Sequence, residues 1–240
     1  MNTENSLAKI HLSVDCTVLG FNGSRLEVLL IRRTGEEGGQ EFHDMKLPGS
    51  LILDNEELDD AALRVLAELT GLKNISLHQF RTFGSINRTK DPKDVHWLEH
   101  AQKAHVHRIV TVAYIALVKT GRATAREMEG SEALWVPIDA IPSLAFDHNE
   151  IISAALGHLR NRANEDPSLL YALLPRKFTV TQLRNLCEVV FGTRLDPANF
   201  YKKVIQLPYL VALDEREKGV AHRAARFYRF DKNIFNKTRI

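Results

Sequence analysis

The sequence predicts an α+β protein with two domains, an α/β/α sandwich at residues 1–160 and a winged helix-turn-helix at residues 168–240. The order of elements supports this prediction. Strand-like runs around two helical segments come first, and a set of helices with a hairpin follows them. Charge divides the chain at the same place. From Ser168 onward there are 14 Lys/Arg and 6 Asp/Glu, against 18 and 24 before it. A basic region joined to an acidic body suits contact with nucleic-acid phosphates.

Apolar and β-branched runs predict the strands of the first domain. Asn22-Gly23 lies between the first two runs and predicts a tight hairpin. Helical spacing of apolar residues predicts one helix over Leu58–Leu69 and another over Asp147–Arg162. The polar segment Asn161–Pro167 is the expected linker. The strands are expected at His11–Leu19, Arg25–Arg32, Gln79–Phe83, Arg108–Val118 and Ala133–Val136.

Capping residues delimit the helices of the second domain. Thr179 can cap a helix over Val180–Phe191, which Gly192 stops. Asp196 is placed to cap a further helix over Pro197–Gln206, with proline in its first turn. The other expected elements are a short helix at Ser168–Leu174 and strands at Tyr209–Leu213 and Ala225–Phe230, joined by a charged wing loop.

The first helix carries the frame of a pyrophosphate-cleaving motif. The Nudix box reads Gly-x5-Glu-x7-Arg-Glu-apolar-x-Glu-Glu-x-Gly-apolar, and Gly71 aligns with its last Gly. Ser50 then replaces the first Gly, whereas Glu56 and Arg64 keep their positions. The segment Val65-Leu66-Ala67-Glu68-Leu69 stands where Glu-apolar-x-Glu-Glu belongs. The frame is therefore present with most of its carboxylates replaced.

These replacements bear on metal binding. Mg²⁺ needs oxygen ligands, and residues four apart share one helix face. Val65 and Leu69 offer no lone pairs beside Glu68. We therefore expect a domain that binds a nucleotide without efficient cleavage, with no catalytic residue and no metal site. The alternative is an active pyrophosphatase with an irregular Mg²⁺ site built from Glu56, Glu57, Asp59, Asp60 and Glu68.

Other patterns narrow the functional class. His96-x-x-Glu99-His100 matches a zinc-protease motif but lies in the polar insertion Asn87–Lys103, where such residues are usually exposed. Cys16 and Cys187 resemble small buried hydrophobes, which indicates a reducing, cytoplasmic setting. Neither a membrane-spanning run nor a signal-peptide core is present in the sequence, so no membrane partner is expected.

The winged helix predicts a partner, double-stranded DNA. In helix-turn-helix modules the recognition helix enters the major groove, and flanking residues contact phosphates. The alternative is a solvated basic face on a helical appendage. The expected DNA-binding residues lie on the third helix, at the start of the second helix and on the wing: Asn199, Tyr201, Lys202, Lys203, Arg176, Lys177, Thr179, Thr181, Lys218, Arg223 and Arg226.

The whole chain resembles the Nudix-related transcriptional regulators of NAD metabolism, the NrtR group. The resemblance rests on the box and on five other stretches. These are Leu47–Ser50, Thr82–Gly84, Val112–Leu117, Leu144–Ile151 and Phe227–Phe230. The chain departs from the familiar compact pattern by the long insertion Asn87–Val106, which could alter ligand access or dimerisation.

The resemblance implies a homodimeric repressor of NAD-biosynthesis genes. Its Nudix-like domain would sense ADP-ribose, with no cofactor required, and ligand binding would release operator DNA. An alternative effector is a sugar or sugar phosphate. Arginine forks suit a diphosphate. The ligand-binding residues carried over are Arg32, Ser50, Arg64, Glu68, Arg81 and His148.

Overall fold

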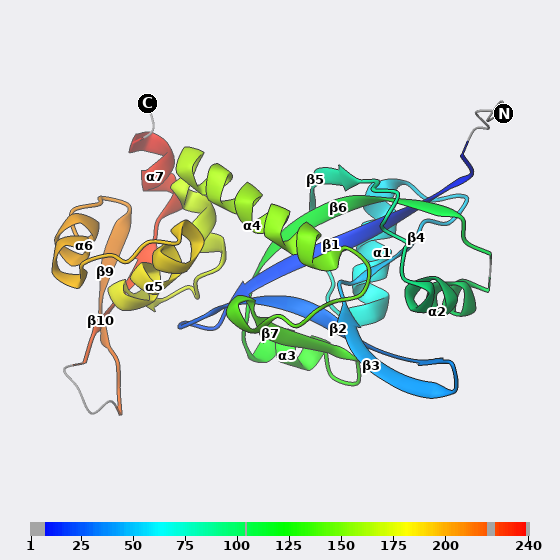
Figure 1. Ribbon diagram of the computed structural model, residues 1–240. Helices are drawn as coiled ribbons and strands as arrows, with labels where there is room; N and C mark the ends of the chain where they lie inside the picture. Colours follow the sequence, from blue (N-terminus) through cyan, green and yellow to red (C-terminus); the bar gives the residue numbers. More distant parts are fainter. Residues whose placement is uncertain (1–7, 104, 220–223, 239–240) are drawn as a thin grey trace. The chain divides into compact units, whose positions relative to one another are not determined.

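The computed structural model describes residues 8–103, 105–219 and 224–238, and the chain divides into two compact units (Figure 1). The first unit comprises the chain up to Val18 with Val28–Ala116 and Ala125–Ala155. The second comprises Leu19–Glu27, Leu117–Thr124 and the chain from Leu156 onward. The division falls inside helix α4 (His148–Glu165). The expected linker is thus helical as far as Glu165, because the segment from Asn161 to Asp166 contains neither Gly nor Pro.

A mixed sheet dominates the first part of the chain. Within the described residues it has the order β3-β2-β1-β6-β5, and β4 pairs with β1 and β7 with β2. The β2–β3, β5–β6 and β1–β4 pairs are antiparallel. All five expected strands are confirmed. The strand-like Met45-Lys46-Leu47 before the Pro-Gly turn overlaps the end of a further strand, β3, and β4 was not predicted. The strands are β1 (Ile10–Phe21), β2 (Leu26–Glu37), β3 (Gln40–Lys46), β4 (Gly49–Leu51), β5 (His78–Phe83), β6 (Arg108–Lys119) and β7 (Ala133–Pro137).

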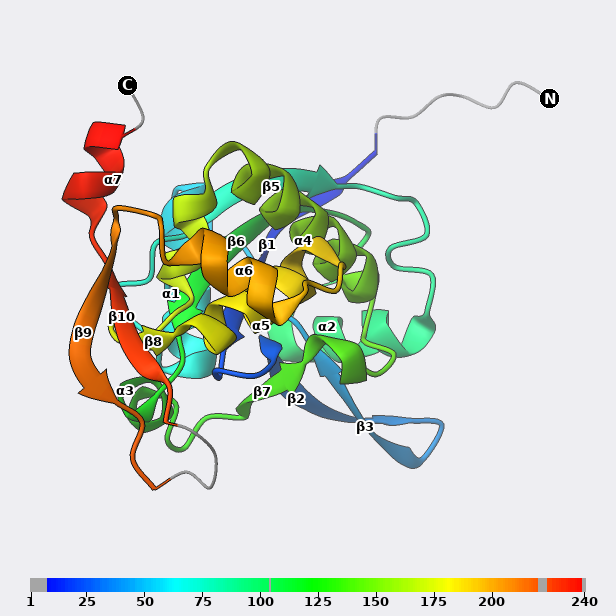
Figure 2. The same ribbon diagram turned by 90° about the vertical axis from the view of Figure 1, so that its left-hand side faces the viewer.

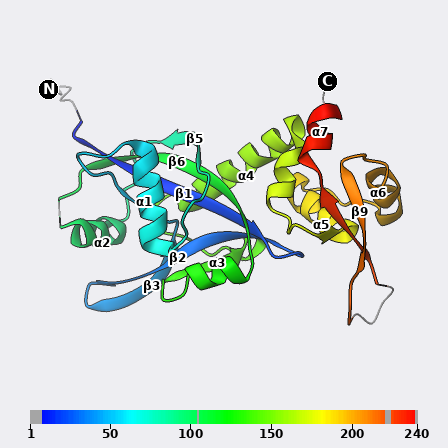
Figure 3. The ribbon, with the colours of Figure 1, turned by 180° about the vertical axis from the view of Figure 1, so that it is seen from behind.

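Helices cover both faces of this sheet. Helix α1 (Leu58–Thr70) lies across one face, and the beginning of α4 lies across the other, as the opposite views in Figures 1 and 3 show. Val65 and Leu66 of α1 are buried in the core. The helix ends at Gly71, whose φ of 76° suits glycine, and a Cβ there would lie 2.0 Å from the Glu127 carbonyl oxygen. The predicted α/β/α sandwich is confirmed.

Two further helices were not predicted. The polar insertion forms α2 (Pro92–Gln102), which begins after Asp91 and has proline in its first turn. The Asp91 side chain accepts a hydrogen bond from the Lys93 backbone N–H at 3.0 Å, an N-cap that the sequence signals by Asp-Pro. Leu98 of α2 packs in a small apolar cluster with Val106 and Ile109. Helix α3 spans Arg122–Glu127.

The chain beyond α4 forms a winged helix (Figure 2). Thr179 and Gln182 form a capping box at the start of α5, and Gly192 ends it, as expected. The expected helix at Ser168–Leu174 is a 3-10 helix, and the third helix ends at Val204, one turn before Pro208, because the residue before a proline disfavours helix. The elements are η2 (Pro167–Ala172), β8 (Phe178–Thr179), α5 (Val180–Phe191), α6 (Pro197–Val204), β9 (Leu210–Arg216), β10 (Arg226–Phe230) and the unpredicted α7 (Lys232–Thr238).

Candidate ligand-binding site and nucleic-acid interface

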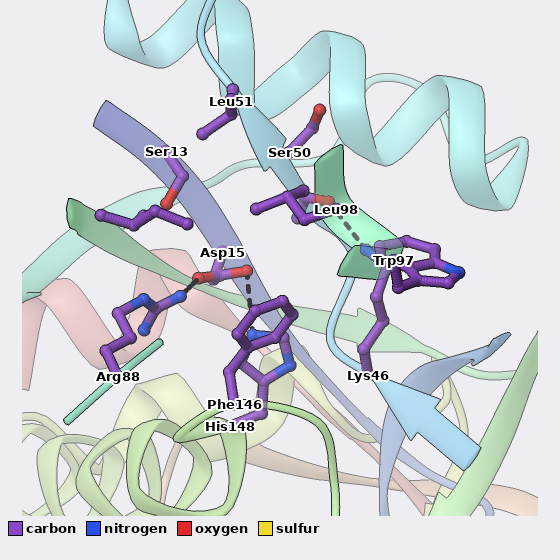
Figure 4. Close-up of a pocket in the computed structure, with 12 residues that line it drawn as sticks. Ser13, Asp15, Lys46, Ser50, Leu51, Arg88, Trp97, Leu98, Phe146 and His148 are labelled. Carbon is purple, nitrogen blue, oxygen red and sulfur yellow. Dashed lines mark hydrogen bonds and ion pairs between the residues drawn. The ribbon is translucent and has the colours of Figure 1, made fainter. Parts of the chain in front are cut away.

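A cavity in the first unit brings together strand β1, the end of β3, strand β4, helix α2 and the start of α4 (Figure 4). We call it the Asp15 cavity. Its volume of about 30 Å³ has room for about two water molecules. Charged and polar groups share its wall with apolar ones. The lining residues are Ser13, Asp15, Lys46, Gly49, Ser50, Leu51, Arg88, Trp97, Leu98, Ile109, Phe146 and His148.

Asp15 is the centre of a buried ionic network. Its Oδ2 lies 2.5 Å from Nη2 of Arg88, whose Nη1 donates to Asp147. Its Oδ1 lies 3.3 Å from Nε2 of His148. Burial alone would raise the pKa of Asp15, but the interactions with His148 and Arg88 outweigh it and hold the pKa well below its ordinary value. Asp15 is therefore a carboxylate at neutral pH.

His148 is oriented from both sides of its ring. The backbone N–H of Leu47 donates to Nδ1 at 3.0 Å, so Nδ1 carries no proton. The proton of the neutral ring is then on Nε2, which donates toward Asp15. His148 is 2% exposed, and it links the start of α4 to the turn before β4. The ring is thus a fixed part of the cavity wall.

Lys46 lies on the opposite side of the cavity and is 5% exposed. Its Nζ donates to the carbonyl oxygens of Gly49 at 2.7 Å and Leu47 at 3.2 Å. The Trp97 ring centroid is 5.6 Å from Nζ. Burial lowers the pKa of Lys46 from 10.5 to about 8, although the charge of Asp15 partly opposes this. Most Lys46 side chains are still charged at neutral pH.

The first residue of β4 must be glycine. Gly49 pairs with Asp15 across the β1–β4 ladder. A Cβ at Gly49 would lie 1.8 Å from Oδ1 of Asp15 and 2.9 Å from the Val14 carbonyl oxygen. Any side chain would thus displace the carboxylate at the centre of the network. This close approach explains the Pro-Gly turn that the sequence places here.

A buried arginine fastens α2 beside the cavity. Arg33 contacts Asp44 through Nε at 2.7 Å and Nη2 at 2.6 Å, and its Nη2 also contacts Asp94 of α2 at 2.6 Å. The other oxygen of Asp94 accepts from the Phe146 backbone N–H at 2.7 Å. The Trp97 indole N–H donates to the Thr34 carbonyl oxygen at 3.1 Å. The insertion is therefore tied to β2, β3 and the segment before α4.

The box residues form ion pairs with one another. Arg64 contacts both oxygens of Glu56, at 2.8 and 2.6 Å, and also Glu68 at 3.1 Å. Val65 is fully buried, so its position on α1 faces the core. Among the described residues no group of three or more His, Cys, Asp or Glu side chains could hold a metal ion. Arg64 thus ties helix α1 to Glu56, which precedes the helix.

The structure brings only some of the expected ligand-binding residues together. Ser50 and His148 line the Asp15 cavity. Arg64 and Glu68 pair with each other at the box, outside the cavity lining. Arg32 is exposed and lines a separate hollow on β2 and β3. Arg81 is exposed, with its guanidinium carbon 5.0 Å from the Phe83 ring.

Sequence reasoning missed Asp15, Lys46 and Arg88. Asp15 had a signal, because it is a charged residue inside an otherwise apolar strand. For β2, strand alternation places Arg33 on the inner face and Arg32 outside, so Arg33 carries the buried network. The sequence contains no such signal for Arg88, because its partners Asp15 and Asp147 are 73 and 59 residues away in the chain.

Glu99 of the zinc-protease-like motif has structural contacts. It accepts from the Val106 backbone N–H at 2.8 Å and lies 2.6 Å from Nδ1 of His105. These contacts join helix α2 to the residues just before β6. In the part of the chain that the structure describes, no helix is both long and apolar enough to span a membrane.

Helix α6 presents the candidate nucleic-acid surface. The Asp196 side chain caps it by accepting from the Asn199 N–H at 2.8 Å, and Val204 is buried beneath it. Asn199, Lys202 and Lys203 line a shallow surface hollow together with Gln206. Tyr201 is 46% exposed. All four predicted α6 residues are therefore on the solvent side of the helix.

The other predicted DNA-binding residues differ in exposure and in the contacts they already make. Thr179 is 2% exposed and its hydroxyl accepts from the Gln182 N–H, so it supports the helix. Lys177 pairs with Glu215 at 2.6 Å and Arg226 with Asp214 at 3.0 Å. Arg176, Thr181 and Lys218 are exposed. Arg223 lies outside the described residues.

The box-bearing sandwich and the winged helix define a two-domain protein of the Nudix and winged-helix class. Residues 9–155 match the family model of the NUDIX domain, and residues 170–230 match the NrtR DNA-binding winged helix domain. The chain therefore belongs to the NUDIX family, in its NrtR group, which adds this winged helix to the NUDIX domain.

Relatives that match nearly the full length of the chain support this family assignment. The ADPR responsive transcriptional repressor NtrR of Acinetobacter baylyi is 28% identical over 224 residues, which are 91% of this chain and 81% of that protein. The crystal structure of Shewanella oneidensis NrtR complexed with a 27mer DNA is 25% identical, with a TM-score of 0.65, and covers 94% of this chain and 95% of that one. A second Shewanella oneidensis NrtR structure is 26% identical, with a TM-score of 0.64 and coverage of 92% and 94%.

Proposed function

We propose that this chain is an ADP-ribose-responsive transcriptional repressor of NAD-biosynthesis genes. Its Nudix domain binds ADP-ribose without efficient hydrolysis, and the ligand releases operator DNA. The observation that carries the proposal is the likeness of both units, as one chain, to the Acinetobacter baylyi repressor. The likeness to the DNA-complexed Shewanella oneidensis structure supports the DNA partner.

The geometry of the first unit supports ligand binding without turnover. The Asp15 cavity collects the side chains of Lys46, Arg88 and His148. The box helix presents Val65 and Leu69 where metal-binding carboxylates belong, and Glu68 already pairs with Arg64. Mg²⁺-assisted cleavage needs oxygen ligands at those positions. Incubation with ADP-ribose and Mg²⁺ is therefore expected to release no AMP above background, whereas rapid release would establish the pyrophosphatase alternative.

The exposed face of α6 supports groove recognition. Asn199 offers an amide that can pair with adenine, and Lys202 and Lys203 offer charge for phosphates or guanine. We propose that the protein acts as a homodimer, because a twofold pair of α6 helices would read two half-sites a whole number of helical turns apart. Light scattering of the full chain, alone and with a palindromic operator, tests the stoichiometry, and a monomer in both samples would refute it.

Ligand response requires a difference between two states. ADP-ribose shifts DNA binding only if it binds the DNA-competent arrangement less well than another arrangement. An operator captured from genomic fragments gives the probe for a mobility-shift titration with ADP-ribose. Ribose 5-phosphate and glucose 6-phosphate serve as comparison ligands, because release by these and not by ADP-ribose would favour the sugar-phosphate alternative. Release by ADP-ribose alone supports the proposed effector.

A further inference from the structure

The buried cations of the first unit differ in one respect. Arg33 contacts two carboxylates, Asp44 and Asp94, and Arg88 likewise contacts Asp15 and Asp147. Lys46 is buried to the same degree, but its ammonium donates only to two backbone carbonyl oxygens. Among the described residues no carboxylate oxygen lies within 4.0 Å of its Nζ. Lys46 is therefore a buried charge without a direct counter-ion.

Such a charge is costly in a folded protein. A buried ammonium loses its water shell, and carbonyl dipoles replace only part of that stabilisation. The charge of Asp15 acts on Lys46, but Asp15 already contacts Arg88 and His148. An anion entering the cavity would supply what Lys46 lacks. A phosphate oxygen is suited to this, because its hydrogen bond to an ammonium is charge-assisted.

Two other donors at the cavity have no hydrogen-bond partner in the described parts of the chain. The Ser13 hydroxyl and Nε of Arg88 are buried, and neither has a hydrogen-bond partner in the structure. Both residues line the Asp15 cavity with Lys46 (Figure 4). Buried polar groups are normally paired, so unpaired donors at one cavity point to an acceptor-rich ligand. The phosphate groups of a nucleoside diphosphate are such a ligand.

Trp97 lies beside the Lys46 ammonium in the wall of the Asp15 cavity. Its ring centroid lies 5.6 Å from the Lys46 ammonium and gives it a cation–π contact, which supplies no negative charge. The remaining volume of about 30 Å³ is too small for a phosphate group with its substituents. Trp97 is on α2, the insertion that departs from the compact Nudix pattern. Its ring must therefore move if a phosphate is to reach Lys46.

We propose that Lys46 binds the phosphate groups of the ligand in the Asp15 cavity and that the Trp97 ring leaves the ammonium when they bind. The inference rests on the proposed function for the identity of the ligand. Lys46 is then a binding residue of the Nudix domain that the box motif does not contain. Trp97 is the group that the phosphates replace.

Calorimetric titration of the full chain tests the role of Lys46. The variant Lys46→Met keeps the length of the side chain and removes the charge. Lys90→Gln is the control, because Lys90 is an exposed lysine outside the cavity lining. We expect Lys46→Met to weaken ADP-ribose binding about ten- to hundredfold, the effect of removing one charge-assisted contact, and Lys90→Gln to change it less than twofold. A cooperative thermal transition of each variant shows that it is folded.

Inorganic pyrophosphate separates failure of this inference from failure of the proposed function. If the wild type binds ADP-ribose and Lys46→Met binds it equally well, the role of Lys46 is refuted and the proposed effector stands. If pyrophosphate binds through Lys46 and ADP-ribose does not bind, the anion site stands and the proposed effector is refuted. If the wild type binds neither, both are refuted.

Fluorescence tests the role of Trp97. The chain has two tryptophans, Trp97 and Trp135, so the variant Trp135→Phe leaves Trp97 as the only reporter. We expect saturating ADP-ribose to shift or quench the Trp97 emission, with a midpoint equal to the calorimetric Kd. The same titration in Trp135→Phe combined with Lys46→Met should show the midpoint moved to higher concentration. Ligand binding with unchanged emission would refute the displacement of Trp97.

Discussion

The buried ammonium of Lys46 predicts an unusual dependence of stability on pH. Burial lowers its pKa in the folded protein from 10.5 to about 8. Between these two pH values the unfolded chain binds the proton and the folded protein does not. Stability therefore rises with pH as the solution passes through pH 8, and the gain is complete only above about pH 10.5. Below pH 8 the charge is present in both states and destabilises the fold.

The magnitude follows from the pKa difference. One pKa unit corresponds to about 1.4 kcal/mol. Raising the pH from 7 to 9 should thus stabilise the fold by about 1 kcal/mol through Lys46, of a total of about 3 kcal/mol at higher pH. For a chain of this size 1 kcal/mol corresponds to about 2–4 °C in Tm. Lys46→Met removes the titrating group and should abolish this rise while stabilising the protein at pH 7.

The measurement is urea unfolding of the wild type and Lys46→Met at pH 7, 8 and 9. The series stops at pH 9 because the two thiols titrate above it. Burial raises the pKa of Cys16, and it raises the pKa of Cys187 to about 11. Above the ordinary thiol pKa of 9.0 the unfolded chain therefore loses these protons first, which lowers the stability of the fold. The informative quantity is the difference between the two proteins at each pH. A difference that stays constant from pH 7 to pH 9 would refute the argument that Lys46 is a buried, unpaired charge.

Three further predictions concern other parts of the molecule. Asp94→Ala leaves the buried Arg33 with one carboxylate partner. Urea unfolding should show the free energy of unfolding lowered by about 3 kcal/mol, whereas a loss below about 1 kcal/mol would contradict the anchoring of α2. Gly49→Ala places a Cβ against Asp15 and should cost about 1–3 kcal/mol and weaken ADP-ribose binding, and an unchanged Tm would argue against the close β1–β4 approach. Lys203→Ala should weaken binding to every DNA sequence and lower the slope of log K against log salt by about 1, and an unchanged slope would remove Lys203 from the phosphate contacts.

Local signals allowed much of the fold to be predicted from the sequence. Helix α5 has the predicted bounds because Thr179 caps one end and Gly192 ends the other. The β1–β2 hairpin follows from Asn22-Gly23. Helix α2 was missed because it buries few apolar residues of its own, and the Arg33–Asp94 contact that anchors it spans 61 residues of sequence. Its stability therefore comes from tertiary contacts, which no local window contains.

The candidate site was less accessible to sequence reasoning. The resemblance to a family supplied Ser50 and His148, which line the Asp15 cavity. It also supplied Arg64, whose guanidinium the structure pairs with Glu56 and Glu68. Lys46 precedes the recognisable Leu-Pro-Gly turn, but sequence gives no sign that its ammonium is buried without a carboxylate. Such a property depends on which charges the fold brings near it.

In the proposed function, one ligand bound in the Nudix domain controls the affinity of the winged helix for DNA. Fluorescence anisotropy of a labelled operator with the full chain, titrated with ADP-ribose at fixed salt, measures this control. We expect the anisotropy to fall to that of free DNA as ADP-ribose saturates the protein, and Lys46→Met to need at least tenfold more ligand. Operator binding that stays constant while calorimetry shows bound ADP-ribose would contradict it.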